Sequence, residues 1–163
     1  MSTADAPHPT APTIPGNPPR VLIVRAPYYK EVVDGMTRGA EHILKQAGAN
    51  YDIVDVAGSF ELAQAIRLIA GAPDCVYEGF VALGAIVRGG TDHYQFICAE
   101  TMAGLMQVSL QLGLCLGSGV LTVHSIEQAI ARSGDDGHNK GAETAVAALT
   151  QIGIARRFGG KKS

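Results

Sequence analysis

Residues 88–93, with the sequence RGGTDH, combine residue types that could bind a phosphate and move a proton. Gly89 and Gly90 can adopt positive φ, which lets consecutive backbone N–H groups turn toward one anion. Thr91 can cap the helix expected to follow, and the positive end of that helix also attracts an anion. From these residues alone, a tight turn that needs glycine only for steric reasons is an equally good interpretation.

His93 favours the functional interpretation of this loop. It falls in the first turn of the expected helix, where the helix dipole disfavours a protonated imidazole. A neutral imidazole beside an anion site is suited to accept and donate protons. A hydrogen-bonded structural histidine is the alternative. We expect Arg88, next to the turn, to anchor the loop rather than to bind the anion.

Two further segments carry side chains that could bind a substrate. Tyr28 follows the first expected strand and could stack on a planar heterocycle, although half-buried packing is the ordinary role of tyrosine. Residues 58–61 place the hydroxyl of Ser59, the ring of Phe60 and the carboxylate of Glu61 at the start of a helix. Glu61 could accept hydrogen bonds from a polyol, or simply interact favourably with the helix dipole.

Arg132 is another candidate for binding an anion. It ends a short expected helix and precedes a loop over residues 133–138 that is rich in glycine and aspartate. By itself, an arginine in such a position is more often solvated than bound to a ligand.

Composition and motif content exclude several classes of protein. A net charge of −2 over 163 residues gives no electrostatic reason to expect binding to nucleic acid or to an anionic membrane. The three cysteines are widely spaced, which argues against a disulfide framework and a zinc site. No secretory signal, membrane-spanning stretch, phosphate-binding P-loop or dinucleotide-binding motif occurs. We therefore expect a cytoplasmic protein that performs neither nucleotide hydrolysis nor dinucleotide redox chemistry.

Strands and helices are expected to alternate along the chain. Apolar runs predict strands at the following residues: 21–24, 51–56, 80–87 and 114–122. Helical spacing predicts helices at these residues: 31–47, 60–70, 92–112, 126–132 and 139–158. This alternation predicts an α/β fold, a flavodoxin-like three-layer α/β/α sandwich with a central parallel sheet. Ligands of such folds bind beyond the carboxyl ends of the strands, so we expect the site there.

Residue types also predict the chain's divisions and some local features. Residues 1–19 contain six prolines and are expected to form a disordered arm, followed by one domain over 20–158 and a flexible tail over 159–163. Gly48 is expected to cap the first helix, and Ser125 with Gln128 to form a capping box. Gly117 and Gly119 are expected to weaken the last strand.

Taken together, these stretches resemble the 6,7-dimethyl-8-ribityllumazine synthase family. They appear in family order and at family spacing over roughly residues 20–158, and the glycine-loop and IEQA stretches are highly specific. The matching sequences are GSFE at 58–61, ALGAIVRGGTDHY at 82–94, GVLT at 119–122, IEQAIAR at 126–132 and NKGAE at 139–143. The family performs the penultimate step of riboflavin biosynthesis, as a transferase that needs no metal or organic cofactor. It condenses 5-amino-6-ribitylamino-uracil with 3,4-dihydroxy-2-butanone 4-phosphate and releases phosphate and water.

The resemblance implies a role for each candidate residue. The backbone around Gly90 and Thr91 and the side chain of Arg132 would bind the phosphate, while His93 would transfer protons. The remaining substrate-binding residues would surround the pyrimidine and its ribityl chain. Tyr28 would stack on the ring, Ser59 and Ile86 would contact it through their backbones with Phe60 beside them, Glu61 would hold the ribityl chain, and Lys140 would lie near the pyrimidine.

The resemblance also implies a homo-oligomer, a pentamer or a multiple of it, with active sites between subunits. Arg132 and Lys140 would reach across from the neighbouring subunit. Three residues depart from the family pattern. Ser118 replaces a phenylalanine that walls the pocket in many members, Gln64 replaces a common proline, and Tyr29 replaces an asparagine. None of these departures removes a catalytic group, and Ser118 predicts a roomier pocket.

Two other functions are compatible with the same fold. One is a module that binds a flavin or a ribityl compound without turnover, and the other is a paralogue kept mainly for assembly. The presence of His93, Arg132 and Lys140 together favours the enzyme, because a pure binding protein could lose them freely.

Overall fold

The computed structural model describes residues 8–135 and 137–159, and its centre is a sheet of four parallel strands. The strands are β1 (Arg20–Ala26), β2 (Asn50–Asp55), β3 (Gly79–Val87) and β4 (Cys115–Val123), in the order β2-β1-β3-β4. From β1 the chain passes to β2 on one side and then returns to β3 on the other side. In open α/β sheets this reversal creates a crevice at the carboxyl ends of the two strands concerned, here β1 and β3.

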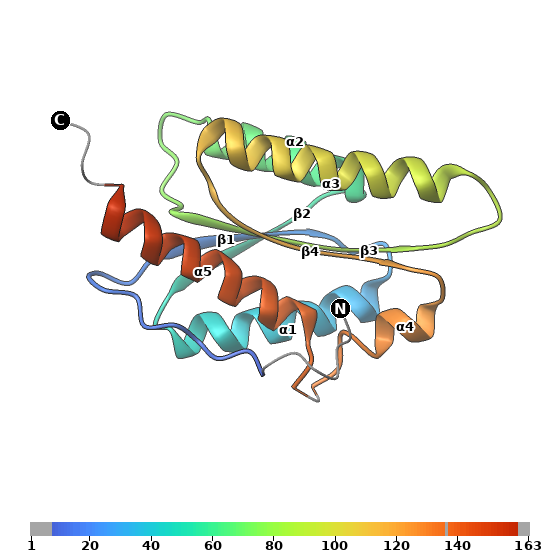
Figure 1. The fold of residues 1–163 in the computed structure, drawn as a ribbon, viewed down its shortest axis with the longest axis horizontal. Helices are drawn as coiled ribbons and strands as arrows, with labels where there is room; N and C mark the ends of the chain where they lie inside the picture. The colour runs from blue at the N-terminus through green and yellow to red at the C-terminus, as the bar shows by residue number, and fades with distance from the viewer. Residues whose placement is uncertain (1–7, 136, 160–163) are drawn as a thin grey trace.

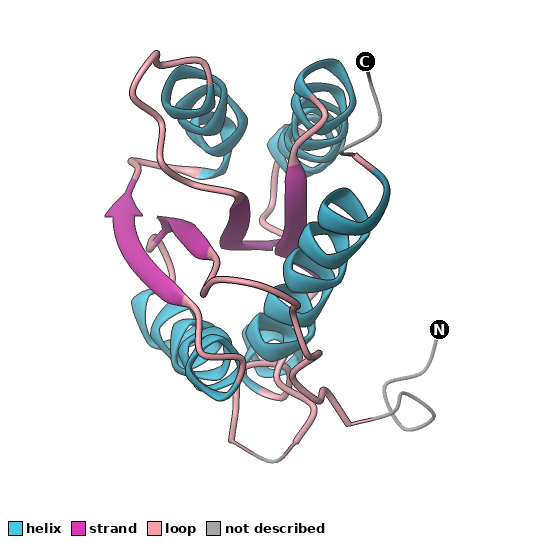
Figure 2. Cartoon of the chain, turned by 90° about the vertical axis from the view of Figure 1, so that its left-hand side faces the viewer, coloured by secondary structure: helices cyan, strands magenta, loops and turns pink. Residues whose placement is uncertain are grey.

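Helices cover both faces of the sheet, as Figures 1 and 2 show. α1 (Lys30–Gln46) and α5 (Lys140–Phe158) pack on one face, and α2 (Ser59–Ala70) and α3 (His93–Leu112) on the other. The short α4 (Ile126–Ile130) follows β4. The predicted flavodoxin-like three-layer α/β/α sandwich is confirmed, and each helix and strand begins and ends within two residues of the predicted bounds.

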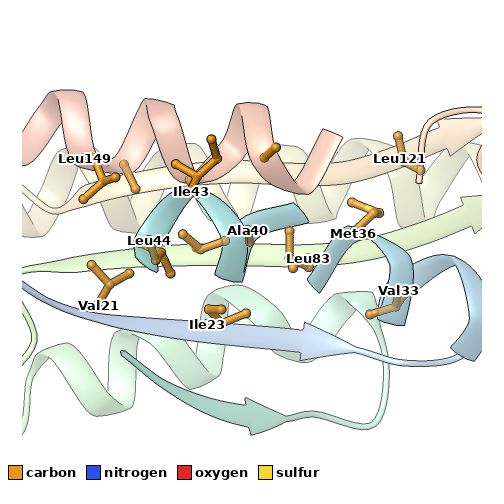
Figure 3. Close-up of a cluster of buried hydrophobic side chains, with 14 of the residues drawn as sticks. Val21, Ile23, Val33, Met36, Ala40, Ile43, Leu44, Leu83, Leu121 and Leu149 are labelled. Atoms are coloured by element: carbon orange, nitrogen blue, oxygen red, sulfur yellow. The ribbon is translucent and has the colours of Figure 1, made fainter. Parts of the chain in front are cut away.

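Alternation along the strands divides the core into two layers. Val21 and Ile23 point to the face covered by α1 and α5, whereas Leu22 and Val24 point to the face covered by α2 and α3. Helical spacing on α1 supplies the matching apolar stripe. Figure 3 shows this stripe, formed by Met36, Ala40, Ile43 and Leu44, against the sheet and α5.

The glycines of β4 let α5 approach the sheet closely. A Cβ atom at Gly117 would overlap the carbonyl oxygen of Thr144 on α5, and one at Gly119 would overlap the Thr144 hydroxyl. β4 continues through both glycines without a break. We expected these glycines to weaken the strand. That expectation did not include the close contact between β4 and α5, which only a residue without a side chain allows.

Predictions at two helix ends meet different outcomes. Gly48 follows the C-cap residue Ala47 of α1 in the left-handed conformation, with φ of 69°. Ser125 is the N-cap residue of α4, but its side chain makes no capping hydrogen bond. The Gln128 side chain accepts instead from the backbone N–H of His124, at 2.9 Å, so the predicted capping box was wrong.

Residues 8–19 form neither helix nor strand, and they lie along α5 (Figure 1). Arg156 of α5 donates hydrogen bonds to the carbonyl oxygens of Pro15 and Asn17, at 2.7 and 2.8 Å. Residues 1–7 and 160–163 of the expected arm and tail lie outside the described residues. The division of the chain after residue 19 stays a prediction. Every helix of the described residues is too short or too polar to span a membrane.

Candidate functional site

A cavity of about 250 Å³ lies at the switch point between β1 and β3. We call it the His93 cavity. Its wall includes five of the predicted site residues, which come from four separate segments: Tyr28, Ser59, Ile86, Thr91 and His93. Ser59 and His93 are the first residues of α2 and α3, so two helix N-termini border the cavity. Their partial positive charges favour an anionic group there.

His93 is exposed at the cavity and lies against the ring of Phe60. The two ring centroids are 6.2 Å apart, at an angle of 59°. The imidazole is therefore accessible to a substrate while an aromatic neighbour limits its position. Phe60 does not itself line the cavity wall, and its contact with His93 was not predicted.

The glycine loop differs in conformation from the prediction. Gly89 and Gly90 do not adopt positive φ, and α3 begins after Asp92, without a side-chain cap. The predictions of left-handed glycines and of Thr91 as the cap were therefore wrong. A Cβ atom at either glycine would meet no heavy atom within 4 Å, so packing within this chain does not explain them. Open space above the loop is what a ligand or a neighbouring chain needs in order to approach the backbone.

Two other predicted residues adjoin the His93 cavity without lining it. Gly90 lies between the lining residues Gly89 and Thr91. The Glu61 side chain is exposed and folds back toward Gly58, where its Oε2 atom would lie 3.1 Å from an added Cβ atom. Arg88 anchors the loop through its backbone, because its N–H donates to the carbonyl oxygen of Val123 at 2.9 Å.

Tyr94 and Ile97 also line the His93 cavity, and sequence reasoning missed both roles. Ile97 is four residues after His93 on α3, so helical spacing was the available signal for Ile97. Burial raises the pKa of the Tyr94 phenol, with the nearby Cys98 adding to the effect. The phenol thus remains neutral over the physiological range.

The other predicted binding residues line a second cavity of about 450 Å³, at the edge strand β4. We call it the Arg132 cavity. Ser118, Arg132 and Lys140 contribute to its wall, together with Glu143 and Thr144. It shares no lining residue with the His93 cavity. The predicted site residues thus form two groups in this chain rather than one.

Charged groups of the Arg132 cavity are tied together by short contacts. Lys140 Nζ donates to Glu143 Oε2 at 2.5 Å, one turn along α5. The Lys140 backbone N–H donates to the carbonyl oxygen of Arg132 at 2.9 Å. Glu143 Oε1 is buried without a hydrogen-bond partner among the described residues. Glu143 was missed as a lining residue, although its spacing of three from Lys140 was a usable signal.

Comparison with known proteins accounts for this combination of fold and side chains. The model of the 6,7-dimethyl-8-ribityllumazine synthase family matches residues 18–156. This chain belongs to that family. It is 42% identical over 148 residues to the 6,7-dimethyl-8-ribityllumazine synthase 1 of Rhizobium meliloti (strain 1021), covering 89% of this chain and 97% of the relative.

Two other lumazine synthases are similar over comparable lengths. The enzyme of Agrobacterium fabrum (strain C58) is 39% identical over 145 residues, covering 87% of this chain and 98% of the relative. That of Afipia carboxidovorans (strain OM5) is 41% identical over 142 residues, covering 85% and 87%. The family resemblance carried by the glycine loop and the other motifs is thereby confirmed.

Within this lumazine synthase family member, the two cavities offer different chemistry. The His93 cavity has an imidazole, an exposed tyrosine ring and two helix N-termini. The Arg132 cavity has two cations and one carboxylate. Among residues 8–135 and 137–159, no three His, Cys, Asp or Glu side chains lie close enough together to hold a metal ion.

Proposed function

We propose that this chain catalyses the condensation of 5-amino-6-ribitylamino-uracil with 3,4-dihydroxy-2-butanone 4-phosphate. The products are 6,7-dimethyl-8-ribityllumazine, phosphate and water. The observation that carries the proposal is the match to the lumazine synthase family over residues 18–156, together with the accessible His93 in a cavity at the switch point. The pyrimidine already carries its nucleophilic amine, so the reaction requires no activated side-chain nucleophile.

Proton transfer would belong to His93. The amine attacks the ketone to form an imine with loss of one water, phosphate is then eliminated, and ring closure with loss of a second water follows. Each step moves a proton, and the exposed imidazole at the cavity can accept and donate these protons one after another. Holding the two substrates side by side supplies a further part of the acceleration.

Pyrimidine binding would use the other lining residues of the His93 cavity. Tyr28 is 78% exposed, so its ring is free to stack on a heterocycle. Ser59 and Ile86 would contact the ring through their backbones, with Phe60 beside His93. Glu61 would accept hydrogen bonds from the ribityl hydroxyls, for which its exposed carboxylate at the start of α2 is suited.

Phosphate binding would combine the backbone around Gly90 and Thr91 with the side chain of Arg132. Lys140 would lie near the pyrimidine. In one chain the glycine loop and Arg132 border different cavities. A complete site would therefore form where the Arg132 cavity of one subunit meets the His93 cavity of its neighbour.

This division of the site supports a homo-oligomer with shared sites, for which the family resemblance implies a pentamer or a multiple of it. The His93 cavity, at about 250 Å³, is also smaller than the roughly 300–1,000 Å³ usual for small-molecule sites, which supports completion by a neighbour. We infer a cytoplasmic location, because all three cysteines are free thiols and reducing compartments keep thiols unpaired.

One experiment tests the proposed function directly. Purified protein is mixed with both substrates, and lumazine fluorescence and phosphate release are followed together. We expect both signals to rise in step, well above the uncatalysed background. No product above that background would reject the enzyme and leave a non-catalytic ligand-binding or assembly role.

A further inference from the structure

The two cations of the Arg132 cavity sit at the ends of one loop, residues 133–139. Seven residues separate Arg132 from Lys140 along the chain, and a single backbone hydrogen bond joins them, at 2.9 Å. Lys140 begins α5, whereas Arg132 follows α4. The distance between the guanidinium and the ammonium therefore depends on what holds this loop closed.

Asn139 lies where the loop meets α1 and α5, and both polar atoms of its side chain make hydrogen bonds. Its Oδ1 accepts from the N–H groups of Gly141 and Ala142, at 2.8 and 3.1 Å, and so caps α5. Its Nδ2 donates to the carbonyl oxygens of Ser133 and Gly134, both at 3.1 Å. Nδ2 also donates to a carbonyl oxygen of α1, at 2.9 Å.

The third acceptor of Nδ2 is the carbonyl oxygen of Gly35 on α1. Asn139 is only 5% exposed. A Cβ atom at Gly39 would overlap its side chain, and one at Gly35 would overlap the carbonyl group of Ser133. These two glycines, one turn apart on α1, thus form a close-fitting wall against which the loop and the Asn139 amide are held.

We propose that Asn139 is a positioning residue that holds Arg132 in place for binding phosphate, while its cap of α5 separately places Lys140. The proposal rests on the proposed function in taking phosphate as the ligand. The physical reason is the two-sided chemistry of the amide. Its oxygen fixes the start of α5, which carries Lys140, and its nitrogen fixes the turn that follows Arg132. Neither a carboxylate nor a hydroxyl can make both sets of bonds.

Two substitutions remove the amide N–H donors and keep a side chain that can cap α5. Asn139→Asp is nearly isosteric and still accepts from the N–H groups of α5, but its second oxygen would face three carbonyl oxygens. Asn139→Ser is neutral, and serine is also a favourable N-cap residue. An equal effect of both variants would exclude the added charge as the cause. Should Asn139→Asp fail to fold, Asn139→Ser carries the test.

The control substitution is Asn50→Asp, at an exposed asparagine at the start of β2, remote from the loop. Affinity for inorganic phosphate is measured by calorimetry, and affinity for the pyrimidine substrate by fluorescence, on the assembled full-length protein. We expect each Asn139 variant to bind phosphate at least tenfold more weakly, with pyrimidine affinity within twofold of wild type. Hydrogen exchange should also become faster at the amides of residues 133–135.

Unchanged phosphate affinity in a folded Asn139 variant would overturn the proposal, as would equal losses for phosphate and pyrimidine. Equal losses would mean that Asn139 serves stability only. Phosphate binding needs no turnover, so the result stands even for a wild-type protein that forms no lumazine. Arg132→Ala is measured alongside, and if it leaves phosphate affinity unchanged, the ligand assignment itself fails and the role of Asn139 fails with it.

Discussion

The Arg132 guanidinium makes one hydrogen bond within its own segment of chain: Nη1 donates to the carbonyl oxygen of Gln128 at 2.8 Å. Its other donors have no partner among the described residues, so they can receive a phosphate. We expect Arg132→Ala to weaken binding of the phosphorylated substrate by about 10- to 100-fold, as for loss of a charged hydrogen bond. Pyrimidine affinity should change little.

Separate titrations of the two substrates check this prediction. Lys140 remains in the variant and keeps its ion pair with Glu143, so the cavity keeps one cation. Equal losses for both substrates would show that Arg132 does not bind the phosphate.

Substitution of His93 is expected to lower turnover rather than substrate binding, unlike substitution of Arg132. His93→Gln keeps a polar side chain beside Phe60 but removes the group that can exchange protons. We expect kcat to fall by about 10²- to 10⁴-fold, the usual contribution of a general acid–base. Phosphate affinity should stay within twofold of wild type.

The matched control is His42→Gln, on α1 and outside the walls of both cavities. Steady-state rates of lumazine formation are compared for the two variants. Retention of wild-type kcat in His93→Gln would show that His93 is a structural histidine, the alternative that its position in the sequence allows.

At the scale of elements, the close contact between β4 and α5 depends on the absence of side chains on the strand. Gly117→Ala would force its Cβ atom into the carbonyl oxygen of Thr144, which cannot rotate away. We expect a loss of about 1–3 kcal/mol in unfolding free energy, as for overpacking of a core. Gly89→Ala is the control, because its Cβ atom meets nothing within 4 Å. Chemical unfolding measures the stability of both variants. Equal unfolding free energies for the two would contradict this explanation.

An ion-pair network ties β1 to β2 and α1. Arg25 of β1 donates to Asp55 of β2 at 2.7 and 2.9 Å and to Asp34 of α1 at 3.2 Å. The Lys30 ammonium, followed by the Arg25 guanidinium, holds the pKa of the Asp34 carboxyl below its ordinary value, against the opposing effect of burial. A lowered pKa means that the ionised carboxylate stabilises the folded state.

This stabilisation is fully present above about pH 4, the ordinary range for an aspartate, and is lost as the pH falls through the lower folded pKa. We expect Asp34→Asn to be less stable than wild type by about 1 kcal/mol or less at pH 7, since the side chain is 31% exposed. The difference should shrink below pH 4. Unfolding at pH 7, 5 and 3 measures it, with the exposed Asp74→Asn as the control. A difference that is constant with pH would contradict the assignment.

At the scale of the whole molecule, the outer face of α3 is unusually apolar for an isolated chain. Phe96, Met106 and Leu110 are 65%, 61% and 74% exposed. Large exposed apolar patches mark contact surfaces. We expect a native mass of five times 17.0 kDa, or a multiple of that mass.

Light scattering and native mass spectrometry measure the assembly. Leu110→Glu places a charge on this face and should shift the mass toward the single chain. Activity should fall with the assembly, because the proposed site combines the two cavities of neighbouring subunits. A wild-type protein of single-chain mass that is fully active would contradict the shared site.

The sequence carries most of the fold because the signals for helices and strands are local. The apolar run before Arg88 and the helical spacing of Met36, Ala40 and Ile43 depend only on neighbours along the chain. Local rules failed where a residue's role depends on a distant partner. Gly117 and Gly119 were expected to weaken β4, before the position of α5 against the strand was known.

The sequence by itself determined the α/β alternation, the family and the residue types of the site, because motifs such as RGGTDH and IEQAIAR are contiguous. Only the tertiary structure decided how those residues are grouped. Strand order puts β4 at the edge of the sheet, so Arg132 and Lys140 line a cavity apart from His93. The part played by Asn139 also emerged only there, since its amide joins Gly35 to Ser133 across 98 residues, a contact that no local pattern encodes.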